Sequence, residues 1–192
     1  MKTLTIIGLL ALFTLTGNAQ GVFDAGLKAG INTSKISTSK DNYTPETINN
    51  YQFGAFARIN MGFIYIQPEA YFNSKSGEYI DKLNASTVNS FNMKTIDVPA
   101  LLGLKIINQK AFNARIMAGP VFSFVTDKSA KGQFTKDNLE NNFFGWQYGA
   151  GVDFLFMTLD VRKETYSKDI YASPDFNTKK GNFVVSLGIK LF

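Results

Sequence analysis

The residues of this chain that could take part in chemistry are carboxylates, cations and glycines, because the sequence contains no His and no Cys. Ser-His and Cys-His nucleophilic catalysis is therefore excluded, and the usual zinc and copper ligand sets are missing. Asp160 and Glu164 could form a carboxylate pair, but Arg162 between them favours ion pairing. Calcium would need a D-x-[DN]-x-[DN]-G loop, which is absent. We predict no catalytic residue, no metal site and no cofactor.

Three glycines have a spacing that partly resembles a phosphate-binding loop: Gly145, Gly149 and Gly151. Such a loop needs a Lys followed by Ser or Thr and the start of a helix, and neither follows here. The other interpretation is that glycines on one face of a strand make room for large neighbours in a narrow barrel. We favour this structural interpretation.

Charged residues of both signs recur inside segments in which apolar and polar residues alternate. Side chains alternate between the two faces of a strand, and these charges fall on the face opposite the apolar residues. Buried charges are tolerated only when they are paired, so a balanced set predicts a mutually neutralised barrel lumen. The alternative is a soluble barrel whose charges face water. The cations are Lys28, Arg58, Lys105, Arg115 and Arg162, and the anions are Glu69, Asp97, Asp153, Asp160 and Glu164.

The segments that contain these charges have aromatic residues at both ends. Tyr51, Phe72 and Trp146 mark one end, and Phe63 and Phe154 mark the other. Between the ends the alternation continues for about ten residues, the length that a tilted strand needs to cross a bilayer. Two aromatic belts around an apolar band predict a transmembrane β-barrel.

The segments predict about eight strands, with short periplasmic turns and longer extracellular loops, as in outer-membrane barrels. The expected strands are 23–34, 51–60, 63–74, 91–107, 111–125, 143–154, 157–166 and 182–192. The long polar connections lie at about 35–50, 75–90, 126–142 and 167–181. The predicted fold is therefore all-β, a single antiparallel up-and-down transmembrane β-barrel. Lys163 is an exception on the apolar face, near a loop end where it could reach the lipid headgroups.

The first residues are typical of a secretory signal peptide. Lys2 supplies the positive charge, residues 4–15 form an apolar run too short to span a membrane, and Gly17 and Ala19 are the small residues of a cleavage site. A short N-terminal anchor helix is the alternative. We predict a signal peptide at 1–19, a barrel domain at 20–192, and localisation in the outer membrane of a diderm bacterium.

Prolines stand inside three of the expected strands, at Pro68, Pro99 and Pro120. Proline cannot donate to the strand ladder, and bulges near the barrel rims are the usual way to accommodate it. The strand registers around these positions are not predicted.

Nearly the whole mature chain resembles the PorT-like outer-membrane β-barrel family. The most specific matching motifs are at 66–69, 96–102, 118–121, 148–153 and 159–162. The resemblance implies a small barrel of about eight strands, prolines at the three positions above, and no enzymatic activity. It does not imply a role in secretion. Insertion would use the barrel-assembly machinery, although Phe192 is one residue out of phase with the apolar residues of the last strand.

Three functions remain open. The first is a non-enzymatic structural or partner-binding scaffold with a filled lumen, and the second is a small, porin-like pore for ions or small solutes. A soluble lipocalin-like binder is the third. Eight strands leave an interior that side chains fill, which favours the scaffold over the pore. The net charge of +5 is scattered, without a nucleic-acid motif, so the expected contacts are outer-membrane lipid and an unidentified protein, with no nucleic acid.

Binding residues usually gather on loops held by a rigid scaffold. The connection at 126–142 combines cationic and aromatic side chains, and we expect it to contact a partner first. The candidate contacts are Lys128, Lys131, Phe134 and Lys136.

Overall fold

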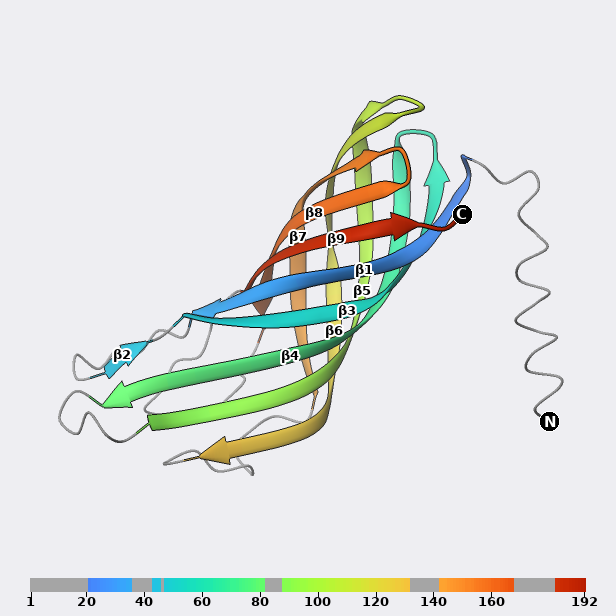
Figure 1. Ribbon diagram of the computed structural model, residues 1–192. Helices are drawn as coiled ribbons and strands as arrows, with labels where there is room; N and C mark the ends of the chain where they lie inside the picture. The colour runs from blue at the N-terminus through green and yellow to red at the C-terminus, as the bar shows by residue number, and fades with distance from the viewer. Residues whose placement is uncertain (1–20, 36–42, 46, 82–87, 132–141, 168–181) are drawn as a thin grey trace, which may run out of the picture.

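The computed structural model describes residues 21–35, 43–45, 47–81, 88–131, 142–167 and 182–192, so the signal peptide predicted at 1–19 lies outside it. The described residues form one antiparallel sheet of nine strands (Figure 1). No helix among them is long and apolar enough to cross a membrane. The strands are β1 (Phe23–Lys35), β2 (Tyr43–Pro45), β3 (Thr47–Met61), β4 (Ile64–Asp81), β5 (Val88–Asn108), β6 (Phe112–Lys131), β7 (Asn142–Phe154), β8 (Met157–Tyr166) and β9 (Asn182–Lys190).

The sheet closes into a barrel of eight strands, as predicted. Its order is β4-β3-β1-β9-β8-β7-β6-β5, and a further pairing between β5 and β4 closes the ring. The short strand β2 adds to β4 outside the ring. We call the end with the tight turns the turn end and the opposite end the loop end. In two of the turns Gly62 and Leu155 have positive φ angles of 71° and 51°, the backbone conformation that tight hairpins require.

Strands β4, β5 and β6 run further toward the loop end than expected. β6 continues to Lys131 in register with Ser90 of β5, and its pairing with the described part of β7 reaches Phe124 and Asn142. β4 and β5 remain paired as far as Ile80 and Val88. The connections predicted at 75–90 and 126–142 are therefore partly strand. Figure 1 shows these three strands curving away together at the loop end.

The prolines interrupt the ladders without shifting the register. Between β4 and β5 the pairs run to Pro68 and resume at Tyr71 with the same offset, and Pro120 lies in an unbroken register with β7. The expectation that bulges accommodate the prolines is wrong, because the loss of a donor interrupts the pairing locally but does not require an extra residue. The register shifts lie elsewhere, between Lys94 and Thr95 and between Lys105 and Ile107.

The two faces of the barrel differ sharply in polarity. Large apolar side chains are exposed along the outer face, with aromatic residues near both ends, such as Phe63 and Phe156 at the turn end and Trp146 at the loop end. On β3 and β4, Phe53 and Phe72 stack across the strands with ring centroids 5.3 Å apart. The buried residues are mostly polar or charged and lie inside. This polarity suits a barrel surrounded by lipid.

A closed barrel satisfies its backbone hydrogen bonds internally and has no edge, so it resists detergent until it is heated. We therefore expect the mature protein to migrate differently in detergent gels before and after boiling. The measurement is a gel shift on membrane extracts. A single band at both temperatures, with recovery of the protein in the soluble fraction, would contradict the membrane barrel.

Candidate functional site

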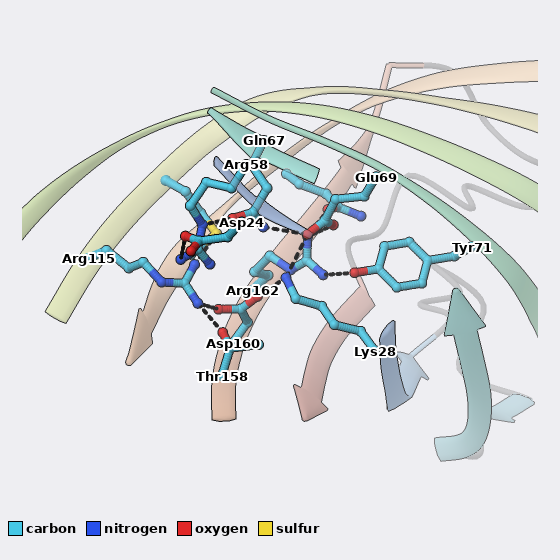
Figure 2. A network of polar contacts seen from close by, with 12 residues as sticks. Asp24, Lys28, Arg58, Gln67, Glu69, Tyr71, Arg115, Thr158, Asp160 and Arg162 are labelled. Atoms are coloured by element: carbon cyan, nitrogen blue, oxygen red, sulfur yellow. Dashed lines mark hydrogen bonds and ion pairs between the residues drawn. The ribbon is translucent and has the colours of Figure 1, made fainter. Parts of the chain in front are cut away.

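The interior near the turn end is organised around Arg115 of β6. Its Nη2 atom lies 2.6 Å from Asp160 Oδ1 and 2.9 Å from Asp153 Oδ1, and it also donates to Thr158. Arg58 of β3 lies 2.6 Å from the other oxygen of Asp153. These contacts connect β3, β6, β7 and β8 across the interior (Figure 2).

The middle of the lumen is occupied by Lys28, Glu69 and Arg162. Lys28 Nζ lies 2.7 Å from Glu69 Oε1 and 2.5 Å from Asp160 Oδ2. Arg162 Nη1 lies 2.5 Å from Glu69 Oε2, and its Nη2 donates to the hydroxyl of Tyr71 at 3.2 Å. Each oxygen of Glu69 therefore has its own cation, which offsets the cost of burying the carboxylate.

The side chain of Lys75 of β4 lies in the interior near the loop end. Its Nζ lies 3.0 Å from Asp97 Oδ2 and 2.8 Å from Glu164 Oε1. The same atom lies 4.7 Å from the ring centroid of Phe143 and 4.9 Å from that of Tyr166. Two carboxylates and two aromatic faces thus surround one ammonium group, a geometry that combines ion pairing with cation–π attraction.

Gln147 of β7 joins the middle and loop-end groups. Its Oε1 accepts from Arg162 Nη1 at 3.2 Å, and its Nε2 donates to Glu164 Oε2 at 2.5 Å. The polar network therefore extends continuously from Arg58 near the turn end to Lys75 near the loop end. It holds opposite walls of the barrel at fixed positions.

Glycines on the inner face leave space for the large side chains of this network. A Cβ atom on Gly151 would collide with Asp160 Oδ1 and would lie 3.0 Å from the Arg115 guanidinium carbon. A Cβ atom on Gly103 would collide with the Tyr65 ring. Gly151 therefore has the structural role that the glycine pattern predicted, and Gly103 on β5 has the same role.

The structure places nine of the ten predicted lumen charges on the inner face, where they are buried. Lys105 differs, because it is only half-buried and forms none of the ion pairs found among the described residues. Two charged members of the network were not predicted. Asp24 lies 3.5 Å from Arg58, and Lys75 falls in a stretch expected to be a loop. The sequence did indicate an inner position for Lys75, because this residue alternates in phase with Tyr71 and Asn73.

The four candidate loop contacts are placed differently from the prediction. Lys128 and Lys131 belong to β6 and not to a loop. Phe134 and Lys136 lie outside the described residues.

The contacts of the inner side chains limit the chemistry that the interior can perform. Its charges bind one another through short contacts, and no group of three or more metal-ligating side chains converges among the described residues. A few buried polar atoms have no hydrogen-bond partner there, among them Arg58 Nη2 and Arg162 Nε. The arrangement suits a rigid interior more than one that exchanges substrate.

Comparisons with known proteins agree with this geometry. A family model described as an outer membrane protein β-barrel domain matches residues 18–167. The outer membrane protein OprG of Pseudomonas aeruginosa is 11% identical, with a TM-score of 0.51 over 88% of this chain and 94% of that chain. At this identity the likeness shows the fold alone.

A second similar structure is Ail, the attachment invasion locus protein of Yersinia pestis, at 13% identity and a TM-score of 0.45, over 88% of this chain and 98% of that chain. Ail in complex with the heparin analogue sucrose octasulfate matches at 12% identity and a TM-score of 0.44, over 88% and 99% of the two chains. The comparison with curated proteins found no match.

Proposed function

Since the chain belongs to the outer membrane protein β-barrel domain family and is an outer-membrane β-barrel protein, we propose that it is a non-enzymatic scaffold that binds a partner at its loop end. The motifs at 66–69 and 96–102 support a place among its PorT-like members. Outer-membrane barrels keep their short turns on the periplasmic side. In this proposal the loop end therefore faces the cell exterior.

The scaffold role rests on a lumen that side chains fill. The largest inner side chains, Arg58, Arg115 and Arg162, are each at most 1% exposed. Next to them Tyr65, Leu101 and Met117 form an apolar cluster that is also buried. An eight-stranded barrel has an interior just wide enough for side chains. This supports a closed lumen over a pore, and we expect no single-channel conductance in planar bilayers.

The observation that carries the proposal is the sheet that protrudes beyond the barrel ring. We define it as residues 77–81 of β4, 88–94 of β5 and 126–131 of β6, with β2 added at the β4 edge. Strands β4 and β5 remain paired without a gap from Tyr71 to Ile80, and β6 stays paired with β5 across one register shift at Lys94, so the sheet is joined to the barrel below. A partner could therefore dock on them without ordering a flexible chain first, and such preorganisation lowers the cost of binding.

We expect replacement of residues 128–141 by a short Gly/Ser link to weaken partner capture while the barrel stays heat-modifiable. The replacement removes the end of β6 from the protruding sheet and leaves the pairing of β6 with β7 up to Phe124 intact. The measurement is the yield of crosslinked partner from photoreactive residues at the loop end in intact cells.

A matched replacement of residues 168–181 serves as the control, because it shortens another connection without removing any part of the protruding sheet. Loss of partner capture only in the first variant supports the proposal. If both variants keep partner capture and the protein conducts ions in bilayers, a pore function takes its place.

A further inference from the structure

At the loop end, β6 extends further than the described part of β7. The pairing of the two strands reaches Phe124 and Asn142 among the described residues, and β6 continues along β5 to Lys131. The backbone of Ser167 bonds to the carbonyl of Phe144 just beyond β8, at 3.0 Å. A cavity of about 360 Å³ lies over the loop-end residues of these two strands, and we call it the notch. It is lined by four phenylalanines and three polar residues, namely Phe122, Phe124, Phe143, Phe144, Ser123, Asn142 and Ser167.

The apolar side of the notch belongs to the outer surface of the barrel. Phe122 and Phe124 are each nearly half exposed, and the Phe122 and Phe144 rings meet across the strands with centroids 5.2 Å apart. Phe144 also makes an edge contact with exposed Trp146 at 5.9 Å. The notch is therefore continuous with the loop-end aromatic belt, which in an outer-membrane protein lies at the level of the headgroups.

The polar side of the notch carries hydrogen-bonding groups but no charge. Asn142 and Ser167 are exposed, and the Ser123 hydroxyl accepts from Lys75 Nζ at 3.3 Å. Phenylalanine side chains next to amide and hydroxyl groups match a molecule with a hydrocarbon chain and a neutral oxygen function at one end. The described lining residues carry no charge of their own, and the Lys75 ammonium group behind Ser123 is already paired with Asp97 and Glu164.

From this geometry we propose that the notch binds one acyl chain of a membrane lipid, with the lipid's ester oxygens against Asn142 and Ser167. Its continuity with the lipid-facing belt identifies the membrane as the source of the ligand. A second cavity, of about 490 Å³, lies on the outer face over β1 between Leu27, Phe53 and Leu187. No Asn, Ser or Thr side chain lines that groove, so it provides an internal reference for ordinary lipid contact.

The test uses the full mature chain in nanodiscs of phosphatidylethanolamine that contain a trace of the same lipid with a diazirine on its acyl chain. Photolysis and peptide mass spectrometry then locate the crosslinks. We expect labelling at residues 122–124 and 142–146 to exceed labelling of the reference groove. In the variant F122S/F144S the notch labelling should fall by about tenfold, the order expected when two phenyl rings no longer cover a chain.

The variant F183S removes an exposed ring of the same belt on β9, away from the notch, and should leave the notch labelling unchanged. The variant N142L/S167A keeps the apolar wall and removes the polar side, and it should also lower the labelling. All variants must first show the heat-dependent gel shift of a closed barrel. Uniform labelling around the belt, or labelling that F122S/F144S does not change, would overturn the proposal.

Discussion

Replacing Arg115 with Met is expected to lower the free energy of unfolding by about 3–5 kcal/mol, the cost of removing one partner from a buried ion-pair network. Arg115 is 1% exposed and contacts two carboxylates, Asp153 and Asp160, from β7 and β8. Methionine has a similar length but no charge, so the lumen keeps both carboxylates with one cation fewer. Asp153 still contacts Arg58 and Asp160 still contacts Lys28, which places the expected loss toward the lower end of that range.

The measurement is urea unfolding of the purified barrel in detergent micelles. Lys94→Met is the matched control, because Lys94 pairs with Asp127 at 3.4 Å while both side chains are more than 60% exposed. A surface pair of this kind contributes about 0–1 kcal/mol. Equal and small effects of the two substitutions would place Arg115 in water and would favour an inverted, soluble barrel.

The alternation of apolar and polar residues was enough to predict the eight barrel strands, because a half-buried strand repeats every two residues. The strand ends were harder to predict at the loop end. There Lys75 and Ser76 of β4 were assigned to a polar connection, although the backbone continues as strand to Asp81. Polar composition marks both a loop and a strand with water on its outer side, so composition alone does not separate them.

The partners within the lumen could not be predicted. The sequence places each charge on the inner face, but the pairing depends on the tilt and stagger of the strands around the ring. Glu69 of β4 meets Arg162 of β8, 93 residues away, and Lys28 meets Asp160, 132 residues away. For Lys105 the predicted burial itself was wrong. It follows the inner phase, but it lies beside a register shift near the turn end, where the interior opens.

Lys163 is placed as its sequence position suggested. It is exposed on the outer face, opposite Tyr148 of β7 and Phe183 of β9. Both neighbours are exposed aromatic residues of the loop-end belt. A lysine at this level can extend its ammonium group toward the headgroups while its stem stays in the apolar band.

Substitution of Gly103 by Val is the second change for which we expect a large effect. Any Cβ atom at this position collides with the ring of Tyr65, which is completely buried. The ring has little room to move, because the guanidinium carbons of Arg58 and Arg115 lie 5.1 Å and 5.9 Å from its centroid. Overpacking of this kind costs about 1–3 kcal/mol or more, and we expect the upper end of that range because two ion-paired arginines would have to shift.

A double substitution separates this steric cause from a general intolerance of β5. Tyr65→Val removes the ring, so G103V should cost less in the Y65V background than in the wild type, by about 0.5–3 kcal/mol of coupling. Ala100→Val, on the exposed outer face of the same strand, is the control and should unfold close to the wild-type midpoint. If G103V were as harmless as A100V, the lumen would have free space at this level. If G103V cost as much in the Y65V background as in the wild type, its effect would come from the backbone at Gly103 and not from the Tyr65 ring. The double-mutant cycle therefore tests directly whether side chains fill the barrel.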